Sequence, residues 1–187
     1  MSNVIRFEHV NMAFGEKTIF SGLSLAFFSP GQYAILGPSG RGKTTLLRLI
    51  AGLDRPLGGA VTLPKDARIS FCFQEDRLLP WRTILENIEL VCGNRETAQQ
   101  WLDRVGLGSE ADSYPASLSG GMKRRASLAR ALAYDADILL MDEPFRALDD
   151  ATHAQMLSLV REAAKNKLLI LVTHDEADTD GMQIIRL

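Results

Sequence analysis

The sequence predicts an α/β fold in which helices pack on the faces of a parallel, largely buried sheet. Apolar segments of strand length alternate with segments of helical period toward both ends of the chain. This alternation is typical of parallel sheets, whose strands are covered on both faces. A glycine-rich loop at residues 37–44 lies between one such strand and a helix. Ligands bind at turns of this kind in open sheets, so the loop is the first candidate site.

The individual elements follow from local patterns. Strands are expected at Val4–Glu8, Leu23–Phe28, Gln32–Leu36, Val61–Leu63, Arg68–Phe73, Asp137–Met141, Leu168–Thr173 and Met182–Leu187. Helices are expected at Thr44–Ala51, Arg95–Val105, Met122–Ala133 and about Ala151–Ala164. A further helix begins at a capping box formed by Thr83 and Glu86. The helical block from about 83 to 133 forms an insertion beside the sheet.

Composition and charge limit the classes of partner. The 187 residues allow one sizeable core, and the net charge of −2 favours neither nucleic acid nor an anionic membrane. The apolar runs Ile138–Met141 and Leu168–Val172 are far shorter than the roughly 20 residues of a membrane span. The N-terminal residues lack the features of a signal peptide. We therefore expect a cytoplasmic protein that reaches a membrane only through a partner, with Cys72 and Cys92 reduced and buried.

The glycine-rich loop matches the phosphate-loop pattern G-x-x-x-x-G-K-[ST] at every fixed position. Its residues are Gly37, Pro38, Ser39, Gly40, Arg41, Gly42, Lys43 and Thr44, and Thr45 follows. Backbone N–H groups freed by the glycines point at an anion, and the helix that follows adds the positive end of its dipole. Lys43 is placed to reach the β- and γ-phosphates, and the Thr44 hydroxyl to ligate Mg²⁺. The loop therefore predicts that the chain binds ATP with Mg²⁺.

Two acids follow the apolar strand 138–141. Because ligands bind at the carboxyl ends of strands in open α/β sheets, Asp142 is expected to hold Mg²⁺ together with Thr44. Glu143 is the next residue, faces differently, and is placed to polarise an attacking water as general base. Two acids after a strand are a weak signal alone, and the phosphate loop is what assigns them these roles.

A third segment narrows the class of phosphate-loop protein. It is Leu118-Ser119-Gly120-Gly121-Met122, followed by the basic run Lys123–Arg125. It resembles the signature motif of ABC transporter ATPases, in which the fifth residue is usually Gln and Met is a known variant. Physically it is a second anion site, because a hydroxyl and free N–H groups meet at a helix N-terminus. The resemblance implies two copies arranged head to tail, so that each signature closes on the γ-phosphate held by the other copy.

Other positions match motifs of the ABC family in order along the whole chain. Phe14 matches the aromatic residue that lies against adenine, and Gln74 matches the glutamine that senses Mg²⁺ and the attacking water. His174 matches the switch histidine that contacts the γ-phosphate. His9 and His153 match no motif, and we expect them to be solvated.

Ala147-Leu148-Asp149 matches the family's loop that crosses the dimer interface, with Arg146 where Ser is more usual. The resemblance thus implies a nucleotide site shared between two copies, with Asp149 among its cofactor-binding residues. The residues that it assigns to catalysis are Lys43, Gln74, Glu143 and His174. Those that it assigns to the metal are Thr44, Gln74 and Asp142.

The segment Gln74-Glu-Asp-Arg-Leu-Leu-Pro-Trp81 resembles the loop of importer ATPases for nitrate, sulfonate, taurine and related small anions. In the family this loop receives a helix of the transmembrane permease. Leu78, Leu79 and Trp81 are therefore expected to supply an apolar contact on a polar surface. The alternative is that Trp81 packs inside its own domain. We expect the run Lys123–Arg125 to be a solvated helix face.

The resemblance covers the whole chain and implies one ABC ATPase domain over residues 1–187. Its phosphate-loop core is expected at about 1–74 and 134–187, with an antiparallel β part from the N-terminal strands, and its helical subdomain at about 75–133. The chain ends soon after His174, and the stretch Arg55–Arg68 is short, but neither departure removes a nucleotide-contacting motif.

The implied function is that of a homodimerising ATPase subunit, held at the inner face of the cell membrane by permease subunits, that drives uptake of a small anion. Two alternatives stay open. One is a soluble ABC ATPase that serves assembly or regulation. The other is a subunit that binds ATP but hydrolyses it weakly.

Overall fold

The computed structural model describes residues 4–187, which form two sheets. The first is antiparallel in the order β2-β1-β4, from Val4–Phe14 (β1), Lys17–Phe28 (β2) and Gly58–Thr62 (β4). The second is parallel in the order β5-β6-β7-β3-β8. Its strands are Gly31–Leu36 (β3), Ile69–Cys72 (β5), Ile138–Asp142 (β6), Leu168–Val172 (β7) and Gln183–Arg186 (β8). The predicted parallel sheet and antiparallel N-terminal part are confirmed.

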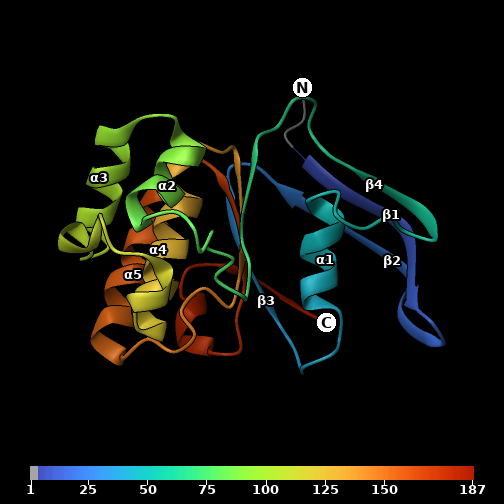
Figure 1. Cartoon of the computed structure of the whole chain (residues 1–187). Coiled ribbons are helices and arrows are strands. Elements are labelled where there is room, and N and C mark those ends of the chain that lie inside the picture. The colour runs from blue at the N-terminus through green and yellow to red at the C-terminus, as the bar shows by residue number, and fades with distance from the viewer. Residues whose placement is uncertain (1–3) are drawn as a thin grey trace.

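Helices lie on both sides of the parallel sheet (Figure 1). They are Lys43–Ile50 (α1), Ile84–Cys92 (α2), Arg95–Arg104 (α3), Gly120–Ala133 (α4) and Asp150–Ala163 (α5). Three short 3₁₀ turns span Gly108–Glu110 (η1), Pro115–Ser117 (η2) and Glu176–Thr179 (η3). Helix α1 lies between the parallel and antiparallel sheets, and α2 to α5 gather on the opposite side (Figure 1). Within residues 4–187, no helix is both long and apolar enough to cross a bilayer.

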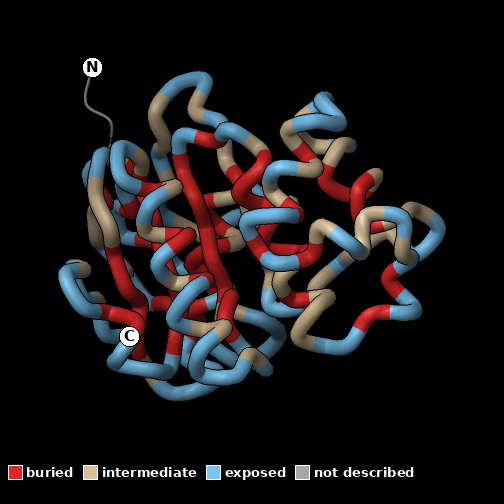
Figure 2. The backbone as a smooth tube through the Cα atoms, turned by 90° about the vertical axis from the view of Figure 1, so that its left-hand side faces the viewer, coloured by how far each residue is buried: buried red, intermediate tan, exposed pale blue. Residues whose placement is uncertain are grey.

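Strands β6 and β7 divide their side chains between two apolar cores, because successive residues of a strand point to opposite faces. Leu139 and Met141 of β6 pack into the core shared with α2 to α5. Ile138 and Leu140 pack into the core shared with α1 and the antiparallel sheet. Buried backbone therefore runs through the middle of the molecule, and exposed backbone forms the outer loops (Figure 2).

The N-terminal hairpin is longer than the sequence predicts. We expected strands to end at Glu8 and to resume at Leu23, whereas β1 continues to Phe14 and β2 begins at Lys17. The register shifts between Phe7 and Val10, and His9 has a φ of 48° in the left-handed region. Such a bulge breaks the alternation of apolar and polar residues on which the prediction depended. The extension carries Phe14 to the edge of the phosphate loop.

Two helix starts show how local capping sets the boundaries. The predicted capping box is present at α2, where the side chains of Thr83 and Glu86 each accept from the other residue's backbone N–H. Helix α4 begins at Gly120, two residues earlier than predicted, because the Ser119 hydroxyl accepts from Met122 N at 3.3 Å and caps it.

Candidate functional site

The loop between β3 and α1 has a backbone that requires glycine. Gly40 and Gly42 have φ of 76° and 95°, which side chains disfavour. A Cβ atom on Gly42 would lie 2.5 Å from Ile19 Cγ2 and 2.8 Å from the Phe20 ring. The loop is therefore packed tightly against β2, with its peptide groups close to the neighbouring strand. Only glycine allows this approach.

Lys43 lies over the loop that precedes it. Its Nζ donates to the carbonyl oxygens of Gly37 at 2.7 Å and Pro38 at 3.1 Å. Across the described residues, no side chain caps the first turn of α1. An ammonium group, the N–H groups of a first helical turn and a helix dipole thus meet at one point. These groups fit a polyphosphate.

Thr44 and Asp142 form the metal-binding candidate. The Thr44 hydroxyl donates to Asp142 Oδ2 at 2.8 Å. Burial raises the pKa of Asp142, and the hydrogen bond from Thr44 opposes that shift. A hydroxyl and a carboxylate are oxygen ligands of the kind that Mg²⁺ takes, so this pair fits the predicted cation. The structure brings these two residues together as the sequence predicts.

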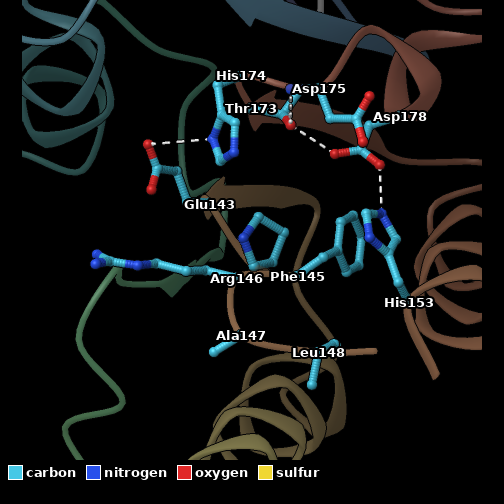
Figure 3. A pocket seen from close by; sticks show the side chains of 11 residues that line it. Glu143, Phe145, Arg146, Ala147, Leu148, His153, Thr173, His174, Asp175 and Asp178 are labelled. Carbon is cyan, nitrogen blue, oxygen red and sulfur yellow. Dashed lines mark hydrogen bonds and ion pairs between the residues drawn. The ribbon is translucent and has the colours of Figure 1, made fainter. Parts of the chain in front are cut away.

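Glu143 is held in an uncommon backbone conformation beside Asp142. Its φ is 46°, in the left-handed region that non-glycine residues rarely adopt. Its N–H donates to the Val172 carbonyl at 2.9 Å. Its Oε2 accepts from Gln74 Nε2 at 3.2 Å, and its Oε1 lies 3.9 Å from His174 Nδ1. Figure 3 shows Glu143 and His174 facing one another from separate loops. Three of the predicted catalytic residues therefore meet.

An open cleft of about 360 Å³ joins the phosphate loop to these acids. It is lined by Phe14, Lys17, Ile19, Ser39, Gly40, Gly42, Lys43, Thr44, Thr45, Gln74, Asp142, Glu143 and Val172. The Phe14 side chain is free to stack with a ligand, because the residue is 51% exposed at the rim. Lys17, which the sequence analysis missed, adds a second cation to the wall. Its position at the turn of a hairpin carries no signal in the sequence.

The signature segment lies apart from this cleft. Ser119 is exposed at the N-terminus of α4, where its oxygen accepts from Met122 N and its O–H can still donate. A Cβ atom on Gly121 would lie 3.5 Å from the Ala147 carbonyl oxygen and 3.7 Å from Leu148 Cδ2, so the signature packs against these two residues. Asp149 caps α5 by accepting from Thr152 N at 3.0 Å. That hydrogen bond is the main cause that lowers the pKa of Asp149.

His153 is not solvated, contrary to our expectation. Its Nε2 lies 2.5 Å from Asp178 Oδ1, and its ring stacks on Phe145 with the centroids 5.0 Å apart. The other carboxylate oxygen of Asp178 accepts from the Thr173 hydroxyl at 2.5 Å. Figure 3 shows this chain of contacts in the pocket that also contains Glu143 and His174, while Arg146 points away. Asp178 lies in the 3₁₀ turn η3, 25 residues after His153, so nothing in the sequence indicated that the two residues would pair.

The basic run Lys123–Arg125 is not a solvated face either. Arg124 is only 3% exposed, and its guanidinium faces inward. The helical spacing did indicate that Arg124 faces inward. Arg124 is four and eight positions before Leu128 and Leu132, which are buried on the same side of α4. A charged residue within an apolar stripe is a candidate for an internal hydrogen-bonding role.

The turn that precedes α2 presents Trp81 to solvent. Trp81 is 70% exposed, so the alternative in which it packs inside its own domain is wrong. Leu78 is partly buried against the core. The buried Asn87 side chain accepts from Leu79 N at 2.7 Å and donates to the carbonyls of Leu79 and Arg82 at 3.1 and 3.3 Å. This amide, which the sequence analysis missed, holds the turn in place.

Comparisons with known proteins agree with this geometry. A model of the ABC transporter family matches residues 20–146. An aliphatic sulfonates import ATP-binding protein of Granulibacter bethesdensis is 47% identical over 178 residues, which are 92% of this chain and 74% of that protein. A protein of the same name from Paracoccus denitrificans is 41% identical over 182 residues, which are 94% of this chain and 74% of that protein.

Solved structures match over nearly the whole chain. An ATP-binding cassette in a dimeric post-hydrolysis state, bound to ADP and Pi, matches with a TM-score of 0.89 and 30% identity. The match covers 98% of this chain and 94% of that one. A dimeric structure of the same bacterial ABC transporter cassette matches with a TM-score of 0.89 and 31% identity, over the same shares of the two chains.

Proposed function

The chain belongs to the ABC transporter family and is an ATP-binding ATPase. We propose that it is the ATPase subunit of an importer of small anions. Support for the solute class comes from the relatives named as aliphatic sulfonates import proteins and from the Gln74–Trp81 segment. Aliphatic sulfonates are the first solutes to test, ahead of nitrate and taurine.

ATP hydrolysis in this proposal depends on position and charge more than on covalent chemistry. The loop N–H groups and Lys43 hold the phosphates, and Phe14 stacks on the adenine. Mg²⁺, held by Thr44, Asp142 and Gln74, would neutralise charge on the phosphates. Glu143 accepts the proton of the attacking water. Gln74 and His174 orient that carboxylate and the water, as their approach to Glu143 supports.

The proposal that two copies share each nucleotide depends on one observation, which is that two anion sites lie apart in one chain. Lys43 lines the cleft, whereas Ser119 lies outside it at the start of another helix. A single ATP does not need both sites within one molecule. We therefore assign Ser119, Gly120, Gly121 and Asp149 to the nucleotide bound by a second copy. The two dimeric structures of a cassette with the same fold support this arrangement.

Complementation between two inactive variants tests the shared site. Lys43→Ala removes the phosphate-binding cation. Gly120→Asp places a negative charge at the signature, where a Cβ meets nothing within 4 Å, so that the fold is preserved. In a mixed dimer, one site combines an intact loop with an intact signature. Each variant alone should be inactive, and an equimolar mixture should recover up to about a quarter of wild-type turnover if pairing is random.

Gly120→Ala is the matched control, because it fills the same space without charge and should retain activity. An inactive mixture of the two variants, each still folded, would contradict the shared site.

At the membrane, we propose that Leu78, Leu79 and Trp81 dock a helix of the permease, so that the chain is cytoplasmic and peripheral. The exposure of Trp81 and the rigid support from Asn87 favour this surface. We also assign residues 75–133 as a helical subdomain, which carries this surface and the signature, and the remaining residues as the core. Co-expression with permease subunits should move the chain into the membrane fraction, and Trp81→Glu should reverse this. If the chain stays in the soluble fraction both with and without the permease subunits, the result would favour a non-transport ATPase.

A further inference from the structure

Arg124 is the most heavily hydrogen-bonded side chain near the site. Its guanidinium donates to the carbonyl oxygens of Phe73 at 2.6 Å, Gln74 at 3.2 Å, Asp142 at 3.0 Å, Glu143 at 2.7 Å and Pro144 at 2.9 Å. A sixth contact joins it to Asp76 Oδ1 at 3.4 Å. One buried cation on α4 thus ties together the segments that follow β5 and β6. These segments carry the metal-binding and catalytic candidates.

The contacts fix the backbone that aims Glu143. A left-handed φ at a non-glycine residue persists only where the surroundings hold it. Arg124 Nη2 holds the Glu143 carbonyl on one side of the residue, and the Val172 carbonyl holds its N–H on the other. The same guanidinium holds the carbonyl of Gln74, whose amide donates to the Glu143 carboxylate. Both partners of the Gln74–Glu143 hydrogen bond are therefore set by one side chain.

Arginine suits this set of carbonyl partners better than any other residue, because its guanidinium group is planar. Five N–H groups leave it in fixed directions, and each of its three nitrogens faces at least one carbonyl oxygen. A lysine in the same place has three donors on one nitrogen and cannot span both segments. Methionine fills the space and donates nothing. These two residues therefore give a graded series of substitutions.

We propose that Arg124 is a positioning residue for ATP hydrolysis, acting through the backbone of Glu143 and Gln74. This inference rests on the proposed role of Glu143 as general base. Because α4 begins at Gly120 and is capped by the signature residue Ser119, the same side chain links the signature helix to the catalytic pair of its own protomer. Within residues 4–187, none of the hydrogen bonds of Arg124 reaches the phosphate loop or Phe14, so its effect falls on turnover much more than on ATP affinity.

The test measures kcat, KM and ATP affinity for Arg124→Lys and Arg124→Met, with turnover normalised to the fraction of protein that binds ATP. We expect kcat to fall by about 10-fold for lysine and about 100-fold for methionine, because small displacements of a catalytic group carry costs of this size. ATP affinity should stay within about 3-fold of wild type, since binding the phosphates depends on the other side of the cleft.

Arg125→Lys is the matched control. Arg125 Nη1 donates to the carbonyls of Val105 at 2.7 Å and Gly106 at 3.2 Å, so this substitution loosens α4 away from the site. Its kcat should stay near the wild-type value. A kcat for Arg124→Lys within about 2-fold of wild type, or a loss equal to that of Arg125→Lys, would overturn the proposal.

The same substitution measured in the Glu143→Gln variant separates the positioning role of Arg124 from the proposed role of Glu143. In Glu143→Gln, the substitution Arg124→Lys should cause little further loss of residual turnover, because the group that it positions is already gone. A further loss of the full 10-fold would mean that Arg124 acts elsewhere. Wild-type turnover in Glu143→Gln alone would instead remove the general-base role and the positioning role together. An inactive Glu143→Gln with an unaffected Arg124→Lys would overturn only the positioning role.

Discussion

The Thr44 hydroxyl donates a 2.8 Å hydrogen bond to the carboxylate of Asp142, a residue 98 positions further along the chain. The order of the parallel sheet brings them together. Val172 of β7 pairs with Ile35 of β3 on one side and with Asp142 of β6 on the other. The end of β3, the phosphate loop that follows it, and the acid at the end of β6 therefore lie at the same level of the sheet.

Asp142→Asn should raise stability and abolish Mg²⁺-dependent ATP hydrolysis. Burial raises the pKa of Asp142 above its ordinary value of 3.8, so the folded state binds the proton more tightly than the unfolded state. The charged carboxylate therefore costs stability as the pH rises above that value. An asparagine carries no charge and still accepts from Thr44.

Thermal unfolding without nucleotide measures this effect between pH 4 and pH 7.5. Asp142→Asn should unfold a few degrees higher than wild type near neutral pH, about 2–4 °C for each kcal/mol, and the difference should shrink toward pH 4. A lower Tm than wild type at neutral pH would show that the charged carboxylate is stabilising in place.

Glu143→Gln should reduce turnover by at least about 100-fold while ATP binding persists, because the amide cannot accept the proton of a water. The variant should accumulate as an ATP-bound dimer. Size-exclusion chromatography with and without ATP measures the dimer, and phosphate release measures turnover. Glu75→Gln is the control, since Glu75 is an exposed acid beside Gln74 that pairs with Arg77. Full activity of Glu143→Gln would refute the assigned role.

Asp178→Ala should destabilise the fold by about 2–3 kcal/mol, because it leaves the Thr173 hydroxyl and the His153 ring without their acceptor. Chemical denaturation measures the free energy of unfolding. The matched control is Asp180→Ala, at an exposed position two residues later, which should change it by less than about 0.5 kcal/mol. Equal changes in the free energy of unfolding for the two substitutions would show that the hydrogen bonds of Asp178 to Thr173 and His153 do not stabilise the fold.

The pair of Arg48 and Asp54 should give an acid-sensitive contribution to stability. Two hydrogen bonds, 2.7 and 2.8 Å long, join the guanidinium to the carboxylate at the end of α1. The hydrogen bond from Arg48 lowers the pKa of Asp54 below 3.8, so the contribution is present above that pH and is lost as the pH falls through the lowered pKa.

Asp54→Asn should therefore cost about 1 kcal/mol at pH 7, and the difference from wild type should be smaller at pH 2, because the carboxylate takes up its proton as the pH falls through the lowered pKa. Asp112→Asn, at an exposed position, is the comparison and should change the free energy of unfolding by less than about 0.5 kcal/mol at pH 7. Denaturant titrations at the two pH values measure both variants. A difference at pH 2 as large as that at pH 7 would place the effect in packing instead of charge.

Much of the candidate site was predictable because its residues belong to short motifs that are contiguous in the sequence. A phosphate loop needs glycines and a lysine at fixed spacing before a helix, and each feature is local to residues 37–44. The acids Asp142 and Glu143 follow a strand whose apolar run marks it as buried. The cleft gathers both sets with Gln74 and Phe14, as expected. The roles of these residues remain predictions.

The α/β class, the motifs and the capping box at Thr83 could be predicted from the sequence, since each depends on neighbours along the chain. The inward direction of Arg124, the pairing of His153 with Asp178, and the hydrogen bonds of Asn87 to the turn before α2 followed only from the folded structure. The partners of Arg124 and Asn87 are mostly backbone carbonyls, which every residue possesses and which leave no pattern of side chains to recognise. The carbonyls that Arg124 contacts come from segments that the sheet order brings together, and these contacts hold the backbone of the predicted general base in place.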